Sequence, residues 1–237
     1  MFYVSRLLQK HGVQAVFTNR EGGAITDFSL LDEERLAHNI QLLCNQTHIS
    51  MPHQVMQVHK AEMLHCSGLG RIHQQEADIL LATERGVALA VRTADCVPIL
   101  LADKQAGVIA AVHAGWKGTV AQAVLKAVQV MCEHGAHVEK IVASLGPCIG
   151  SCCFTVHSDV AQKLDDACQK NVSFYRDGIC FADLALANQD QLLGAGVRPE
   201  NIEILSHCTA CHADPSYYSF RRDKGDTGRQ FSMIMLA

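Results

Sequence analysis

The stretch from residue 87 to residue 113 constrains the fold more than any other part of the chain. It contains three apolar segments bounded by turn residues, Val87–Thr93, Val97–Ala102 and Val108–His113, a pattern typical of buried strands. Asp103–Gly107 separates the last two and predicts a hairpin connection. Because strands joined so closely pair antiparallel, the sequence does not fit a strictly alternating Rossmann pattern.

The same reasoning predicts further strands and three helices. The further strands are Val13–Thr18, Val55–His59, Ile141–Leu145 and Ile202–Ser206. The helices are a segment with Val120, Val124, Val128 and Met131 at near-helical spacing before a stop at His134–Gly135, and the segments Ser158–Lys170 and Asp183–Leu193. Strands paired through short hairpins and mixed with a few helices predict an α+β fold in which helices cover a mixed sheet.

A chain of 237 residues, 49% apolar and 19% charged, can bury a sizeable core. No repeat, low-complexity segment or linker interrupts it, so we expect one domain over residues 1–237. A net charge of −4 and a pI near 6.3 provide no basic field for nucleic acid or anionic lipid. The expected partner is a small molecule, with no nucleic acid and no membrane.

Eleven cysteines, an odd number, occur without an apolar N-terminal stretch of signal-peptide length. The apolar runs are also too short to cross a bilayer. Disulfide frameworks belong to small secreted domains that lack a core, which this composition does not describe. The cysteines therefore favour free thiols, a metal site and a cytoplasmic location.

Three reactive side chains stand near the ends of predicted strands. Cys96 lies in TADCVPIL, His113 in AAVHAGWKGT, and His59 ends the segment QVMQVHK. One thiolate and two imidazoles suit zinc and leave a fourth coordination position open, as catalytic sites require. Bound zinc lowers the pKa of water to about 7. Spacing alone does not decide the point, because isolated cysteines and histidines at such positions are more often structural.

The motifs as a set resemble the YfiH-like or laccase-domain family, also known as polyphenol oxidase and purine nucleoside phosphorylase. They are FTNREGG, QVH, TADCVPIL, VHAGWKGT, LGPCIGSCCF and the C-terminal CTAC…YYSFRRDKGDTGR, which together span nearly the whole chain. The resemblance implies an α/β/β/α-like layered sandwich and one zinc ion held by His59, Cys96 and His113. It also implies phosphorolysis of adenosine, inosine, guanosine and methylthioadenosine, with adenosine deamination as a second activity.

Other polar residues are candidates for substrate contacts. Asp95 precedes the cysteine ligand and is expected to orient a ligand or handle a proton, with a turn cap as the structural alternative. Arg20 lies in a Gly-rich turn, and Arg221 and Arg222 lie beside aromatic residues. The planar guanidinium suits phosphate oxygens, so these arginines are expected to bind phosphate or a ribose-bearing substrate.

Two cysteine groups remain outside this site. Cys208 and Cys211 form a CxxC pair with no second CxxC to complete a zinc site, and Cys148, Cys152 and Cys153 are closely spaced. Both groups are interpreted as family architecture or adventitious thiols, and not as metal ligands. The chain also departs from the family pattern at Ile40, Lys60 and Lys117, which stand where arginine, glycine and arginine are expected, and these departures bear on substrate choice.

Three alternatives keep the same residues. In the first, the protein is a metal-free hydrolase in which Cys96 is the nucleophile and His113 its base. This chemistry suits the peptidoglycan-editing role that has been linked to family members. A copper polyphenol oxidase is the family's older description, but the 13 histidines form no HxH pair. A purely structural zinc is disfavoured because three ligands leave a position open.

Overall fold

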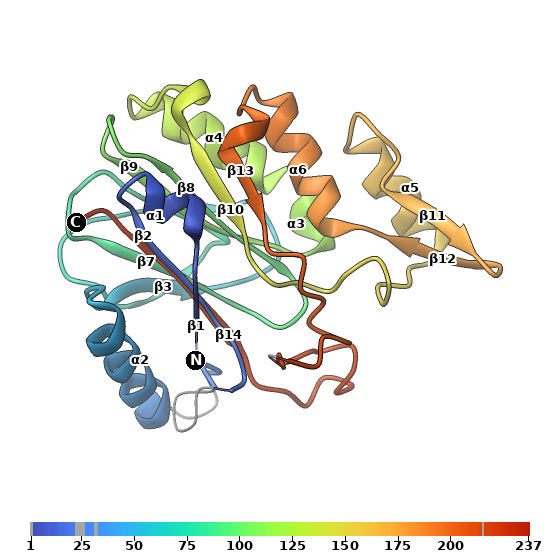
Figure 1. Ribbon diagram of the computed structural model, residues 1–237, viewed down its shortest axis with the longest axis horizontal. Helices are drawn as coiled ribbons and strands as arrows, with labels where there is room; N and C mark the ends of the chain where they lie inside the picture. The colour runs from blue at the N-terminus through green and yellow to red at the C-terminus, as the bar shows by residue number, and fades with distance from the viewer. Residues whose placement is uncertain (1, 22–26, 31–32, 215) are drawn as a thin grey trace.

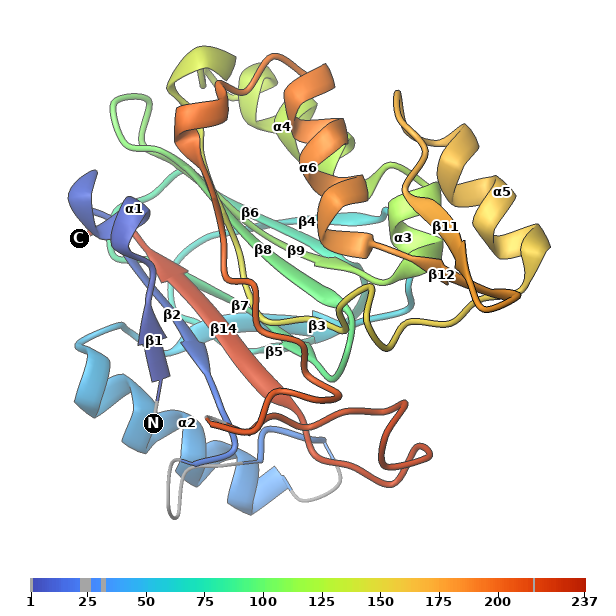
Figure 2. The ribbon, with the colours of Figure 1, turned by 45° about the vertical axis from the view of Figure 1, so that its right-hand side comes forward.

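The computed structural model describes residues 2–21, 27–30, 33–214 and 216–237. Within these residues, two six-stranded mixed sheets lie face to face (Figures 1 and 2). The first sheet has the order β1 (Phe2–Val4), β2 (Gln14–Thr18), β14 (Gln230–Met235), β7 (Ala88–Thr93), β3 (Pro52–Met56) and β5 (Ile72–Glu76). The second has the order β13 (Ile202–Ile204), β10 (Val142–Leu145), β8 (Val97–Asp103), β9 (Val108–Ala114), β6 (Ile79–Ala82) and β4 (Met63–Cys66).

Helices cover the outer faces of both sheets and complete an α/β/β/α arrangement. Helix α2 (Glu33–Thr47) packs on the first sheet, and α4 (Ala123–Glu133) and α6 (Leu184–Gly194) pack on the second. The smaller elements are α1 (Arg6–Lys10), α3 (Trp116–Val120), α5 (Ser158–Asp166) and the hairpin β11 (Ser173–Arg176) and β12 (Ile179–Ala182). The predicted α+β fold with layered mixed sheets is therefore confirmed.

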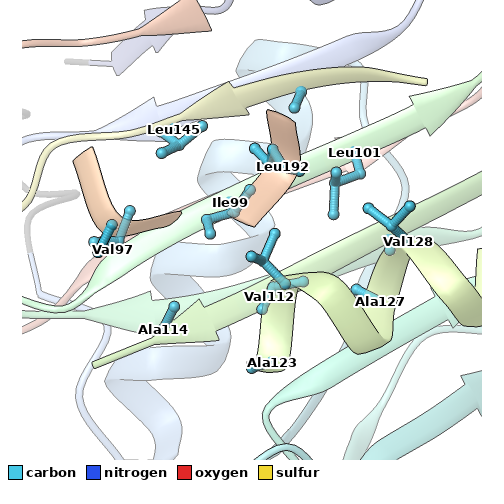
Figure 3. Close-up of a cluster of buried hydrophobic side chains, with 14 of the residues drawn as sticks. Val97, Ile99, Leu101, Val112, Ala114, Ala123, Ala127, Val128, Leu145 and Leu192 are labelled. Carbon is cyan, nitrogen blue, oxygen red and sulfur yellow. The ribbon is translucent and has the colours of Figure 1, made fainter. Parts of the chain in front are cut away.

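Strand β8 contributes side chains to two hydrophobic cores, one under the helices of the second sheet and one between the two sheets. Its residues alternate between faces: Ile99 and Leu101 pack under α4 and α6 (Figure 3). Leu100 and Ala102 face the first sheet. All four are buried, and each fully buried Leu or Ile contributes about 1.5–3 kcal/mol. Because both faces of the strand are covered, its sequence is continuously apolar instead of alternating.

The predicted strands at residues 13–18, 87–93, 97–102, 108–113 and 141–145 are confirmed within one residue at each end. The strand predicted at Val55–His59 lies earlier, at Pro52–Met56, and His59 has a left-handed backbone conformation with φ of 60° that no strand residue adopts. The predicted strand at residues 202–206 ends at Ile204, and the predicted helix at 158–170 ends at Asp166. No helix among the described residues combines the length and apolarity needed to cross a membrane.

Candidate metal centre

His59, Cys96 and His113 come together at one end of the second sheet. Their ligand atoms all lie within 4.8 Å of one another, and the two imidazole rings meet edge to face. His113 is near the end of β9, which pairs antiparallel with β8. Cys96 immediately precedes β8, so the pairing of these strands places the thiol beside His113. His59 reaches the same point from the loop after β3.

Asp78 is hydrogen-bonded to both histidines. One of its carboxylate oxygens, Oδ1, accepts a hydrogen bond from His113 Nδ1 at 2.7 Å and from the His59 backbone N–H at 3.0 Å. The other, Oδ2, accepts from the backbone N–H groups of Lys60 at 2.7 Å and Val58 at 3.3 Å. Because this hydrogen bond keeps the proton of His113 on Nδ1, the lone pair of Nε2 is available to a metal ion.

The electrostatics of the site favour a thiolate. Burial opposes ionisation of Cys96, but the charge and hydrogen bond of His113, with those of His59, lower its pKa to about 6. Burial likewise opposes protonation of His113, but Cys96 and Asp78 raise its pKa to about 9. A buried thiolate beside an imidazolium is the arrangement that a cation replaces readily, since metal binding displaces the imidazolium proton.

Gly115 leaves the space in front of the sulfur open. A Cβ atom at this position would lie 2.7 Å from Cys96 Sγ and 3.2 Å from His59 Cδ2. Only glycine therefore fits between the two ligands. Helix α3 begins at Trp116, directly after this glycine, and it comprises five residues.

These features match what zinc requires. One sulfur and two imidazole nitrogens from separate elements form a suitable set, and three protein ligands leave a tetrahedral position for water or substrate. The carboxylate behind His113 is the usual partner of a zinc-bound imidazole. The three predicted ligands therefore suit a metal ion for three reasons: their donor atoms are of the right kind, these atoms lie close together, and Gly115 leaves space in front of the sulfur.

A cavity of about 780 Å³ opens over this site, a volume suited to a nucleoside-sized ligand. Trp116, Phe154 and Phe220 form an aromatic part of its wall. Thr93 also lines it, and the buried Oγ1 of this threonine has no hydrogen-bond partner among the described residues. Buried hydroxyls are normally paired, so a ligand in the cavity is a natural partner for Thr93.

The structure brings one of the three predicted substrate arginines to this cavity. Arg221 lines it, with Nη1 donating to the carbonyl and hydroxyl oxygens of Thr155. Arg20 lines a separate hollow and lies over the ring of Tyr218. Arg222 donates to backbone carbonyl oxygens and pairs with Asp223.

Two arginines not selected from the sequence, Arg92 and Arg229, also line the cavity. Arg92 is buried and donates to Gln54 Oε1 and to the Val55 carbonyl oxygen. Burial and the charge of Arg229 lower the pKa of Arg92 to about 10. Cations held together in this way create a site for an anion. Arg92 lies inside an apolar strand sequence, where an ionisable residue is itself a signal of function or pairing.

Asp95 positions the C-terminal loop instead of contacting the predicted ligands. Its Oδ1 accepts from Thr209 Oγ1 at 2.6 Å, and its Oδ2 accepts from the Arg221 backbone N–H at 2.7 Å. The residue is buried, lines the cavity and has φ of 90°. Its carboxylate thus holds Arg221 at the cavity wall.

The predicted departures from the family pattern fall in three different places. Ile40 lies on the buried face of α2 and packs in the core, and it does not line the cavity. Lys60 is exposed, with its Nζ 4.0 Å from a carboxylate oxygen of Glu76. Lys117 lines the cavity and lies over the Trp116 ring. The Gly22 and Gly23 positions of the FTNREGG motif fall outside the described residues.

Comparison with known proteins identifies the family of the chain. Residues 14–237 match the family described as "Multi-copper polyphenol oxidoreductase laccase". The chain belongs to this family. It is 41% identical over 180 residues to a purine nucleoside phosphorylase of Deinococcus radiodurans, covering 76% of this chain and 68% of that protein. It is 39% identical over 175 residues to adenosine deaminase RL5 of an unknown prokaryotic organism, covering 69% of this chain and 65% of that protein.

Solved structures show the same architecture. The Bacillus licheniformis hypothetical protein YfiH superposes with a TM-score of 0.88 at 26% identity, over 100% of this chain and 96% of that one. YlmD from Geobacillus stearothermophilus superposes with a TM-score of 0.85 at 27% identity, over 98% of this chain and 94% of that one. The predictions of this family, of its fold and of an enzyme are thereby confirmed.

Proposed function

We propose that this protein is a zinc-dependent purine nucleoside phosphorylase that acts on adenosine, inosine, guanosine and methylthioadenosine and also deaminates adenosine. The observation that carries the proposal is the set of His59, Cys96 and His113 at the base of a cavity lined by arginines and aromatic rings. The names of the relatives, a phosphorylase and a deaminase, support it. When bound, zinc supplies a Lewis acid and a water of lowered pKa.

In phosphorolysis, a phosphate oxygen forms a bond to ribose C1′ while the bond from C1′ to the base breaks and the base takes up a proton. Arg229, Arg92 and Arg221 line one cavity and suit the phosphate, because guanidinium groups match its oxygens. Trp116 and Phe154 offer apolar faces for the purine. Holding both reactants together removes most of the entropic barrier to their encounter.

In deamination, water adds to the purine carbon that carries the amine, and ammonia leaves. This reaction needs no phosphate, so the two activities separate experimentally. Thr93 Oγ1 is available to hydrogen-bond a substrate in the cavity. Asp95 contributes by positioning Arg221 through its backbone N–H.

The test uses zinc-loaded protein with adenosine, in the presence and absence of inorganic phosphate. We expect adenine and ribose 1-phosphate only with phosphate. Inosine should form in both reactions, and with phosphate it should be converted further to hypoxanthine. A Cys96→Ser variant, which removes one ligand with little change in volume, should lose both activities. Zinc-loaded protein that forms none of these products would contradict the proposal.

A hydrolase acting on cell-wall precursors is the second candidate, favoured by the pairing of Cys96 with His113. The lowered pKa of the thiol is what a nucleophilic cysteine needs. Zinc and nucleophilic attack compete for the same sulfur. Chelation therefore discriminates: activity lost on zinc removal and restored by zinc supports the metal enzyme, whereas activity that survives chelation supports the hydrolase.

A copper polyphenol oxidase is the third candidate, suggested by the family description. The structure describes all 13 histidines. Only four of them belong to potential metal sites among the described residues, and each of these two sites has two histidines and one cysteine. Multicopper oxidation needs several copper centres built from many histidines, so this distribution favours zinc. Metal analysis of the purified protein, with a catechol oxidation assay, tests the alternative.

A further inference from the structure

Four cysteines from two distant parts of the chain meet at a second point, outside the cavity. We refer to them as the four-cysteine cluster: Cys152, Cys153, Cys208 and Cys211. Their sulfur atoms all lie within 4.8 Å of one another, and all four are free thiols. The sequence shows only one CxxC pair, because the other two sulfurs come from adjacent residues in a loop more than fifty positions earlier.

We propose that the four-cysteine cluster binds a second zinc ion, in a closed structural site. A tetrahedron with zinc–sulfur bonds of about 2.3 Å has sulfur–sulfur edges of roughly 3.8 Å. Cys152 Sγ and Cys211 Sγ are 3.5 Å apart, close to that edge. Four thiolates fill the tetrahedral coordination of zinc and leave no position for substrate, which is the mark of a structural site.

The backbone around Cys208 is arranged to hold a thiolate. The Gly150 N–H donates to Cys208 Sγ at 3.2 Å. The backbone N–H groups of Ala210 and Cys211 also hydrogen-bond this sulfur. Amide donors aimed at a sulfur neutralise part of the charge that a metal-bound thiolate carries.

Cationic side chains lie beside the two loops that carry the cysteines, the loop with Cys152 and Cys153 and the loop with Cys208 and Cys211. Arg176 Nη2 donates to the carbonyl oxygen of Cys152, and Arg222 Nη1 donates to that of Thr209, between the two CxxC cysteines. A zinc ion with four thiolates has a net charge of −2, since the four thiol protons pass to solvent on binding. Two guanidinium groups nearby compensate this charge and favour the loaded state.

The site would fasten the loops that form the cavity. The loop before α5 carries Ile149 and Phe154 to the cavity wall, and the CxxC loop carries Thr209 to Asp95. The two loops already touch through a bridge between Cys148 and Cys208 and through the hydrogen bond from the Thr209 N–H to the Cys148 carbonyl oxygen. A metal ion bound by cysteines of both loops would cross-link the chain between Cys153 and Cys208 and stabilise the contact between the loops.

Zinc content measured on the full chain tests the proposal. We expect two zinc ions per chain in the unmodified protein. A double variant, Cys152→Ser with Cys211→Ser, should lose one ion, and Cys96→Ser should lose the other. The matched control is Cys132→Ser, an exposed cysteine of α4 outside both sites, which should change nothing. A double variant with the zinc content of the unmodified protein would overturn the proposal.

Two measurements keep the test independent of how the variants fold. In the unmodified protein, the cluster should resist alkylation until a chelator removes zinc, and Cys132 should react throughout. With cobalt in place of zinc, the sulfur-to-metal absorption should fall in the double variant to the level of a site with one thiolate. A peptide map showing a disulfide within the cluster, or iron in place of zinc, would overturn the assignment. Because loss of Cys96 is scored separately, failure here is distinct from failure of the proposed function.

Discussion

Replacing Asp78 with asparagine tests whether a single carboxylate organises the metal centre. The substitution keeps the size of the side chain but turns one acceptor oxygen into an N–H donor. With the amide nitrogen toward Lys60, the backbone N–H groups of Lys60 and Val58 lose their acceptor. With the nitrogen toward His113, the ring must accept at Nδ1, which moves its proton to Nε2 and blocks the metal ligand.

Both orientations carry a cost of similar size. Two lost hydrogen bonds in a partly buried site destabilise the fold by about 2 kcal/mol, at roughly 1 kcal/mol each. For a chain of this length, that lowers Tm by roughly 5 °C. Loss of the partner of a metal-binding imidazole weakens zinc binding about 10- to 100-fold. Thermal denaturation measures the first effect, and competition with a chelator of known affinity measures the second.

Asp103→Asn is the matched control. Asp103 is also buried and accepts backbone hydrogen bonds from Gln105, Ala106 and His137, but it lies at the hairpin end of β8 and contacts none of the ligands. We expect both variants to lower Tm and only Asp78→Asn to weaken zinc binding. Equal zinc affinities in the two variants would refute the role given to Asp78.

Three further predictions concern the same cavity. Gly115→Ala should reduce bound zinc in metal analysis, because the added Cβ would lie 2.7 Å from Cys96 Sγ; full zinc content would show that the site adapts. In chelated protein, iodoacetamide should alkylate Cys96 with a midpoint near pH 6, since its thiolate forms above a pKa of about 6 and is protonated below it; a midpoint near an ordinary thiol pKa of about 8.5 would contradict the pairing with His113. Arg229→Ala should raise KM for phosphate about tenfold or more, as removal of a charged hydrogen-bond donor predicts, with zinc content unchanged. Arg20→Ala, outside the cavity, should leave KM near its original value.

The apolar strands could be predicted from the sequence because they are buried on both faces. β8 and β9 read as continuous hydrophobic runs separated by a short turn, so their pairing follows from local sequence. β14 is also buried, but its sequence, QFSMIM, places polar and flexible residues among the apolar ones and gives no such signal. The sequence of α2 gives no clear helix signal, because its buried residues lie within a largely polar stretch.

The metal ligands could be predicted only because family motifs accompanied them. Their partners could not, because hydrogen bonds that link distant segments leave no local pattern. Asp78 lies 35 residues from His113. Its one sequence signal is a carboxylate immediately before the apolar run ILLA, a position where an ionisable group needs a partner. Arg92 gives the same signal inside β7, so a charge embedded in a strand sequence indicates a buried residue with a partner in another segment.

The strained residues show how the parts of the site depend on one another. His59 and Asp95 both have positive φ, which costs a non-glycine residue of order 1 kcal/mol or more. Each is held in place by contacts beyond its own turn: Asp78 binds the backbone of His59, and Asp95 binds Thr209 and the backbone of Arg221. The strain at Asp95 is thus sustained by the loop that the four-cysteine cluster would fasten. Removing zinc from that cluster should therefore loosen Arg221 at the cavity wall while the ligands on β9 and beside β8 stay fixed by the sheet. We expect the KM for phosphate to rise while the zinc bound by His59, Cys96 and His113 is unchanged. An unchanged KM would show that the sheet alone holds the cavity residues in place.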